Sequence, residues 1–536
     1  MSGMTRWHTL GGTVAVVGCL LALYLLRPGT GELPPSGLRA QELATSLNSI
    51  LDRPRSPVPG VAVLPLAAHG DDPDLLAAVS AFCDLLVRRL QRIEGLRTTS
   101  CASTQASHRL ELPVTSLTSL LQVDHVVSGE IHATDGLLQV TLRFSSLEPE
   151  RERWQLQQSA TLAELDALAE RTGGRIASTL DLGQSDSPAA AIDPDAYALY
   201  LRARQLMRVH QLDPLTRAEA LLIEALAIEP AFAEARISFL LNRTHVLSAH
   251  AMAGTREPEE LLQEQQRLLG ELREVALDIL ATQPDAPIAL SVLLNDAFQG
   301  RRSAEALDHA ERLLGLGARD PEILRAIARL FQATGYLQRA RETALSAASI
   351  DPLTSMSHYT LAMISRMQGQ TARALQEATL ARELGLDVAR VVFAFDAMTR
   401  GAWEDAEREL SAALAAAGQP TDFVAPFIAG LADEAQRDAA VLMLESQDPG
   451  RQFYMLNYMF YYATLGDLVR TRRAAELNGS LTPGVWMLEF WHPELHSFRS
   501  EPAFIEVMDG LGVVSAWERH GPPDDCQRHG ASWRCR

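Results

Sequence analysis

The chain has 536 residues and a formal net charge of -19, and all 48 of its Lys and Arg positions are arginine. Hydrophobic residues make up 47% and charged residues 21%, which is typical of folded domains and excludes a disordered chain or a multi-span transporter. The negative charge disfavours binding to nucleic acid and to anionic lipid surfaces. Because lysine is absent, a P-loop lysine, a kinase lysine, a Schiff-base lysine and a Ser-Lys dyad are excluded.

The amino-terminal region predicts a membrane anchor. Residues 9–26 form an uncharged apolar run that is just long enough to cross a bilayer as a helix. A cleaved signal peptide has a similar basic start and apolar core, but this run ends in Leu-Leu-Arg-Pro without the small residues of a cleavage site. We therefore expect an uncleaved single-pass anchor, with residues 1–8 as a short cytoplasmic tail and the body exported. Residues 27–59, rich in proline, predict a linker.

Residues 60–182 predict a small α/β domain, because short apolar runs alternate with helical periodicity and turn residues. Asp135-Gly136 predicts a hairpin turn between two alternating segments, and residues 68–73 are expected to form a loop. The expected strands are 61–66, 96–100, 123–133, 137–147 and 151–159, and the expected helices are 74–93, 115–122 and 162–180.

This domain resembles the TolB amino-terminal-type domain. The resemblance rests on VAVLPL at 61–66, GLRTTS at 95–100 and VDHVVSGEI at 123–131, with the helices and the strand pair around them. It covers about residues 58–182 and implies a module that often precedes tetratricopeptide repeats in bacterial membrane-anchored proteins. The exported half of membrane-integrated winged-helix regulators and a region of some class III adenylate cyclases look similar. Since only about eight residues precede the expected anchor, we expect neither a winged helix nor a cyclase domain here.

Residues 183–194 are small and polar and predict a second linker. Beyond it, alanines recur with a period near 34 residues, as at Ala340, Ala374 and Ala406. This spacing resembles the tetratricopeptide repeat, in which small residues lie where two helices cross closely. We expect an all-α solenoid over 195–480, with helix pairs at 195–230, 287–320, 321–352, 355–386 and 387–415, an irregular pair at 231–284, and further helices near 421–445 and 450–478.

The remaining segment, residues 481–536, resembles the tail of many TolB-like tetratricopeptide proteins. Terminal repeats need a different outer surface, so we expect this segment to cap the last apolar face of the solenoid.

The oxidation state of the cysteines depends on the compartment in which the body of the protein lies. Cys19 lies in the expected anchor, and the other four fall as Cys83 with Cys101 and Cys526 with Cys535. In an exported body both pairs are disulfide candidates. The alternative is four reduced cysteines in a cytosolic body.

Tetratricopeptide arrays bind protein or peptide partners through the first helix of each pair. By analogy with the family, the partner-binding candidates are Asn295, Arg325, Arg329, Gln332, Tyr359 and Arg366. The alternative for each is an ordinary solvated residue. Arg325 and Arg329 are four residues apart on one helical face, which suits an acidic peptide or a carboxylate terminus.

No pattern predicts catalysis, a cofactor or a metal site. Pro493 and the spacing between His492 and His496 do not fit the HExxH pattern of a zincin. The segment that begins with Asp71, Asp72 and Asp74 lacks the sixth-position glycine and the distal glutamate of an EF-hand loop. We therefore expect no enzyme, no cofactor and no metal.

The function that these observations favour is a non-catalytic protein-interaction scaffold or sensor in the bacterial envelope. It is expected in the inner membrane as a single-pass protein, held by residues 9–26, with its body in the periplasm. The alternative is a signalling or transcription-regulation component that works through a separate partner across the membrane.

Overall fold

The computed structural model describes residues 47, 58–70, 73–110, 112, 117–134, 137–183, 192–207, 212–253, 258–417, 419–446, 455–481, 485–530 and 532–536. The expected tail and anchor lie outside the described residues, as do Asp71 and Asp72. No helix in the described part of the chain is long and apolar enough to cross a membrane. The chain divides into two compact units. We call the part within 58–249 and 348–354 the sheet unit, and the part within 250–347 and 355–536 the helical unit.

The sheet unit is built on a mixed sheet in the order β3-β1-β4-β5-β6. β1 pairs in parallel with β3 and β4, whereas β4, β5 and β6 form an antiparallel meander. β2 also pairs in parallel with β4, further along that strand than β1. The strands are β1 (Gly60–Val63), β2 (Ala67–His69), β3 (Arg97–Thr98), β4 (His125–Thr134), β5 (Leu137–Leu147) and β6 (Glu150–Ala160).

β1 and β2 are two parts of one interrupted strand beside β4. Pro65 lies between them, and a proline has no N–H to donate to a neighbouring strand. Pairing with β4 resumes at Ala67, so residues 67–69 form a strand where the sequence predicted a loop beginning at residue 68.

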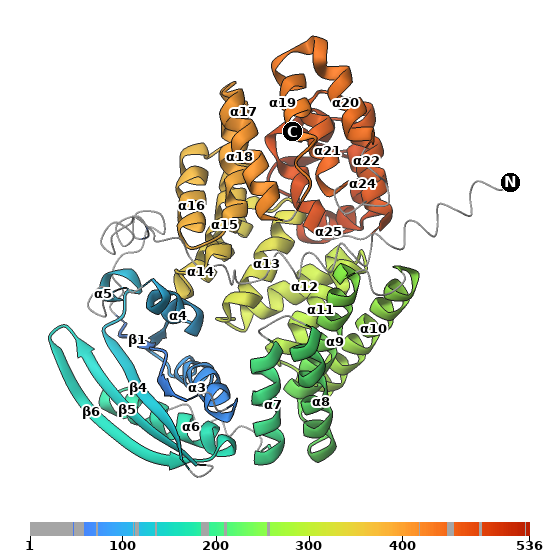
Figure 1. Ribbon diagram of the computed structural model, residues 1–536. Coiled ribbons are helices and arrows are strands. Elements are labelled where there is room, and N and C mark those ends of the chain that lie inside the picture. The colour runs from blue at the N-terminus through green and yellow to red at the C-terminus, as the bar shows by residue number, and fades with distance from the viewer. Residues whose placement is uncertain are drawn as a thin grey trace. The chain divides into compact units, whose positions relative to one another are not determined.

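Helices cover one face of this sheet (Figure 1). Leu138, Val140, Leu142 and Phe144 alternate along β5 and are buried against α3 and α6, as the period of two in a strand requires. The intervening β5 residues point to the opposite, more polar face. The helices are α3 (Pro73–Leu90), α4 (Cys101–Arg109), α5 (Leu117–Leu120), the 3-10 turn η2 (Leu162–Glu164) and α6 (Leu165–Thr179).

The first helices after residue 183 belong to the same hydrophobic core. α7 (Pro194–Met207), α8 (Leu212–Ile228) and the start of α9 (Ala233–Ala253) contribute buried residues to the cluster that contains the sheet. Tyr200 packs edge-on against Phe232, with ring centroids 4.9 Å apart. The expected linker therefore does not separate two cores.

Residues 348–354 also belong to the sheet unit. Ser100 caps the amino end of α4 by accepting from the Ser103 N–H, and its hydroxyl donates to Asp351 Oδ1 at 2.6 Å. The Ser103 hydroxyl donates to the same carboxylate oxygen. Asp351 is buried, so these two hydrogen bonds satisfy a charge that is shielded from water.

The helical unit consists of many paired helices, consistent with a tetratricopeptide-like solenoid. Ala340, Ala374 and Ala406, which reveal the repeat in the sequence, are all buried. The helices are α10 (Pro258–Thr282), α11 (Pro287–Gln299), α12 (Ser303–Gly315), α13 (Pro321–Ala333), α14 (Leu337–Ile350), α15 (Ser355–Met367), α16 (Thr371–Glu383), α17 (Arg390–Thr399), α18 (Trp403–Ala416), α19 (Val424–Ala432), α20 (Arg437–Ser446), α21 (Met455–Thr464) and α22 (Leu468–Leu481), with 3-10 turns η3 (Asp387–Ala389) and η4 (Glu434–Gln436).

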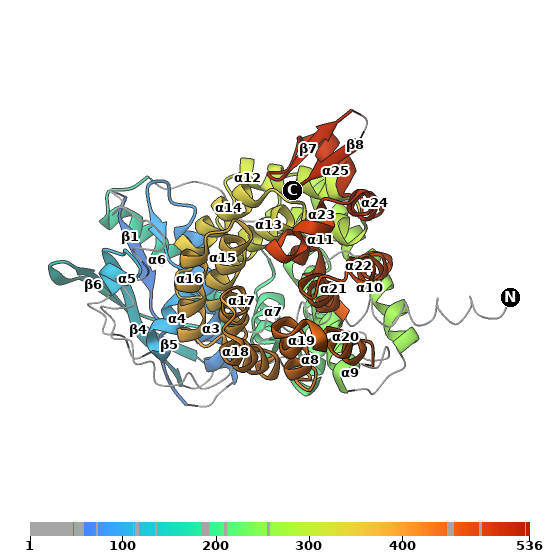
Figure 2. The same ribbon diagram turned by 90° about the horizontal axis from the view of Figure 1, so that it is seen from above.

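The carboxy-terminal segment, residues 485–536, contains short helices and a hairpin. It packs on α21 and α22, as expected for a cap, and it also packs on α12 and α13 (Figure 2). Its elements are η6 (Val485–Trp491), η7 (Pro493–Leu495), α23 (His496–Arg499), α24 (Pro502–Gly510), α25 (Val513–His520), β7 (Cys526–His529) and β8 (Ser532–Cys535).

Candidate functional site

The turn between α13 and α14 is the point where the carboxy-terminal segment is held. The last carbonyls of a helix have no partner within that helix. Here the Trp491 indole N–H donates to the Ala333 carbonyl at 3.1 Å, and the Trp517 indole N–H donates to the Thr334 carbonyl at 2.8 Å. Both indoles are buried, so two remote tryptophans complete the carboxy end of α13.

Asp524 completes the same turn on the α14 side. Its backbone N–H donates to the Gly335 carbonyl at 3.2 Å, and its Oδ2 accepts from the Gln338 N–H at 2.7 Å. A carboxylate at the start of a helix is favoured by the exposed N–H groups there. The Tyr336 hydroxyl donates to the Gly521 carbonyl at 2.7 Å and adds another bond between turn and segment.

The preceding repeat holds the segment as well. Arg519 forms an ion pair with Asp308 at 2.7 Å, and His520 Nε2 lies 3.2 Å from the Ala304 carbonyl. Gly512 packs so closely on Arg301 that an added Cβ would overlap the Arg301 carbonyl. The carboxy-terminal segment therefore packs on two consecutive helix pairs, α11–α12 and α13–α14. Both pairs come well before the last helix pair in the sequence.

Arg366, a partner-binding candidate on α15, is engaged by this segment. Its guanidinium pairs with Glu494, hydrogen-bonds the His492 ring at Nδ1 and lies over the Phe395 ring, 4.3 Å from the centroid. Only 9% of Arg366 is exposed. Its charge is thus met by the chain's own carboxylate.

His492 is enclosed by charged and aromatic side chains. Arginine only donates, so Nδ1 is the acceptor in its contact with Arg366. Nε2 is 3.0 Å from Glu489 Oε2, and the ring packs edge-on against Phe395 and Phe460. His496 is exposed, whereas His492 is fully buried, so the two do not share a face.

A second arginine, Arg499, ties the segment together internally. Its guanidinium donates to the carbonyls of Phe490 and His492, at 2.8 and 2.7 Å, and to the carbonyl of Arg536 at 2.8 Å. Burial lowers the pKa of Arg499 to about 10. The three carbonyls are the groups that hold this buried cation.

The remaining partner-binding candidates fall into two groups. Arg325 is buried, pairs with Glu322 and donates to the Ser357 hydroxyl, and Gln332 is buried with its amide 3.4 Å from the Met367 sulfur. The other three, Asn295, Arg329 and Tyr359, retain surface. Asn295 is exposed and Arg329 half-buried. Tyr359 is also half-buried, and burial together with the negative charge of Glu489 raises its pKa.

Both cysteine pairs are bridged in the structure. Cys83 on α3 is bonded to Cys101 at the start of α4, and Cys526 is bonded to Cys535 across the β7–β8 hairpin. The first bridge lies within the buried core of the sheet unit. The second fixes the end of the carboxy-terminal segment.

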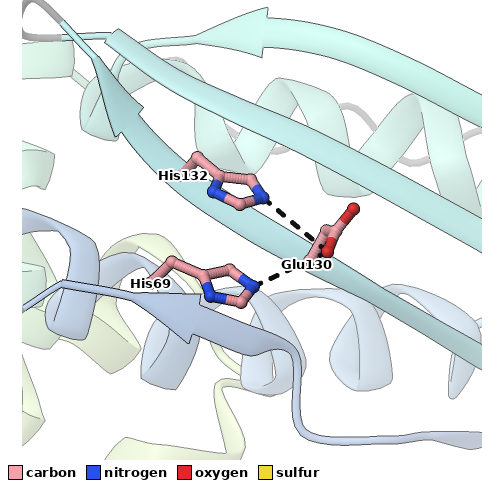
Figure 3. A group of neighbouring side chains, drawn as sticks. All are labelled: His69, Glu130 and His132. Atoms are coloured by element: carbon pink, nitrogen blue, oxygen red, sulfur yellow. Dashed lines mark ion pairs between the residues drawn. The ribbon is translucent and has the colours of Figure 1, made fainter.

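A group of three potential metal ligands, none of them among the site residues that the sequence predicted, lies on the sheet unit. His69, Glu130 and His132 place one ligand atom each within 4.8 Å of one another (Figure 3). The sequence signal was weak, because Glu130 and His132 are separated by one residue in an ordinary alternating strand. His69 was assigned to a loop.

No protein-family model matches the chain, and no curated protein matches it. Among solved structures it is similar to the Cut9–Hcn1 hetero-tetramer of the APC/C, at 13% identity and a TM-score of 0.26 over 67% of this chain and 83% of that chain. It is also similar to human IFIT1, solved as a dimer with PPP-AAAA, at 15% identity and a TM-score of 0.34 over 84% and 98% of the two chains. Both likenesses are too low to carry an argument. The tetratricopeptide-like assignment rests on the chain's own repeat spacing and helix pairing.

Proposed function

We propose that the protein is a non-catalytic protein-interaction scaffold or sensor of the bacterial envelope. In this proposal residues 9–26 anchor it in the inner membrane, and a TolB-like domain and a tetratricopeptide-like array lie in the periplasm. The observation that carries it is the series of helix pairs with buried alanines in phase at Ala340, Ala374 and Ala406. Arrays of this kind present the first helices of successive pairs as a continuous surface for a peptide or protein.

The partner-binding candidates that keep accessible surface indicate where a partner binds. Arg325, Gln332 and Arg366 are buried in the chain's own packing, so a partner reaches them only after that packing opens. Asn295 on α11 and Arg329 on α13 keep accessible surface on the first helices of consecutive pairs. We place the partner surface on these two helices.

The disulfides support export of the body. All four cysteines outside residues 9–26 are paired within the chain. Structural disulfides form and persist in oxidising compartments such as the periplasm and are rare in the bacterial cytosol.

Site-specific photo-cross-linking tests the partner surface. A photo-reactive residue replaces Asn295 in the full-length protein in living cells, and the matched control carries it at Arg312, exposed on the second helix of the same pair. A discrete adduct with one protein at position 295, absent at position 312, is expected. Adducts that are the same at both positions, or no adduct at 295, would count against the scaffold function.

Protease treatment of spheroplasts tests the topology. With a carboxy-terminal tag, digestion from outside is expected for a periplasmic body, and permeabilisation is not needed. Protection of the tag until the membrane is opened would place the body in the cytoplasm and would overturn the envelope role.

A further inference from the structure

The pairing of β2 with β4 brings two histidines and a glutamate together on the surface of the sheet unit. His69 is the register partner of His132 in the parallel β2–β4 pair, and Glu130 precedes His132 by two residues on β4. Since side chains two apart in a strand share a face, all three side chains project from the same face of the sheet. This is the face opposite α3 and α6.

The three side chains converge (Figure 3). The His69 and His132 rings are stacked, with centroids 4.4 Å apart and planes inclined by 6°. Nε2 of each ring lies 3.7 Å from the same carboxylate oxygen, Glu130 Oε2. Two imidazole nitrogens therefore lie on either side of one carboxylate oxygen.

This ligand set matches a divalent transition metal. Imidazole and carboxylate together suit Zn²⁺, and three protein ligands with an open position are typical of zinc sites that keep a bound water. Zinc bonds of about 2.0–2.1 Å give edges between tetrahedral ligands of about 3.3 Å. The ligand atoms all lie within 4.8 Å of one another, so rotations of the side chains that also turn the two rings out of their stacked arrangement bring them to coordination distance.

The three side chains are accessible, and the residues directly opposite Glu130 and His132 on β5 are neutral, with Arg143 the next residue along that face of β5. The exposed side-chain fractions are 56% for His69, 39% for Glu130 and 43% for His132. On the neighbouring strand β5, the register partners of Glu130 and His132 are Thr141 and Gln139, both neutral.

We propose that His69, Glu130 and His132 form a binding site for one zinc-class divalent metal ion. The two imidazoles bind through Nε2 and the carboxylate through an oxygen, with water in the open position. Because the ligands come from β2 and β4, the ion links a three-residue strand to the centre of the sheet. Binding of metal thus stabilises the folded chain by mass action.

Titration of the untagged full-length protein with Zn²⁺ tests this assignment. The protein is first stripped with EDTA and exchanged into chelator-free buffer, and binding is followed by calorimetry. One Zn²⁺ per chain is expected. His69→Ala and His132→Ala should each weaken the affinity by about tenfold or more, since each removes one direct ligand. Glu130→Gln should weaken it less, because the amide keeps one oxygen.

His108→Ala is the matched control, since His108 is exposed in the same unit and lies outside the three-residue group. It should bind zinc as the wild type does. Zinc X-ray absorption of the loaded wild-type protein provides a readout that does not depend on any variant folding, and two imidazole ligands are expected. Fewer than two imidazoles, no binding at about 100 µM Zn²⁺, or full affinity in the His69→Ala/His132→Ala double variant would overturn the proposal.

Discussion

Trp491 donates its indole N–H to the carbonyl of Ala333, a residue 158 positions earlier in the chain. The bond joins the start of the carboxy-terminal segment to the end of a helix in the middle of the array. Together with the Trp517 bond to Thr334 and the Asp524 bonds to Gly335 and Gln338, it makes the segment part of the α13–α14 repeat. The carboxy-terminal segment thus contacts the middle of the array as well as its last helix pair.

Gly335→Ala tests this contact against a control in the same repeat position. Gly335 and Gly369 both have positive φ, 88° and 72°, so an alanine at either is strained by about 1–2 kcal/mol. At Gly369 a Cβ meets nothing within 4 Å, whereas at Gly335 it overlaps the Trp491 ring. We expect Gly335→Ala to lower the free energy of unfolding by about 1–3 kcal/mol more than Gly369→Ala. Urea unfolding followed by tryptophan fluorescence measures both, and equal losses would contradict the close contact.

Arg366→Met tests whether this arginine stabilises the chain. Removing it leaves Glu494, 17% exposed as a side chain, without its cation. Breaking a largely buried pair should cost about 2–4 kcal/mol, and Arg366→Met with Glu494→Gln should recover part of it. Arg472→Met, in the exposed pair with Glu476, is the control and should cost far less. Thermal unfolding compares the three variants with wild type. A stability loss no larger than the control's would mean that Arg366 is not held by the segment.

Thiol counting tests the two bridges. In denaturant without reductant, maleimide should label one cysteine per chain, Cys19, and all five only after reduction. Cys19→Ser should abolish labelling before reduction and supplies the control. The bridged cysteines are 18 and 9 residues apart. Reduction of either disulfide should lower the free energy of unfolding by about 3 kcal/mol, because the unfolded chain gains conformational entropy when the cross-link is removed. Five reactive thiols in the unreduced native preparation would refute the paired state.

The lowered pKa of His125 predicts that the sheet unit loses folding stability in acid. Burial lowers its pKa, the positive charge of Arg153 adds to this, and Asp124 opposes it. The folded state therefore binds the proton less readily than the unfolded state. The stability that depends on neutral His125 is complete above the ordinary histidine pKa of about 6.5, and it is lost as the pH falls from there towards the depressed folded pKa.

The test compares urea midpoints of wild type and His125→Gln at about pH 7.5 and about pH 5.5. The variant should lose less stability on acidification than the wild type. His108→Gln, at an exposed position, should retain the wild-type dependence. An unchanged slope in His125→Gln would show that another group controls the acid response.

Much of the architecture could be predicted from local sequence patterns. The Asp135-Gly136 turn with alternating residues on both sides predicted the β4–β5 hairpin, and the alanine spacing predicted the helix pairs. These signals are local, since a period of two or of 3.6 residues, or a repeat of 34, is written in consecutive residues. α4 carried no such signal, because its polar sequence, CASTQASHR, has little apolar periodicity.

The sequence by itself determined many of the helices and strands, that the helices pair, and which cysteines stand as candidates for bridges. Only the tertiary structure decided that the strand continues after Pro65, which places His69 beside His132. Only the tertiary structure decided that Arg366 pairs with Glu494 of the same chain rather than with a partner. The physical reason is the same in both cases. These contacts join residues 63 and 128 positions apart, and they depend on strand register and helix packing, which no local periodicity encodes.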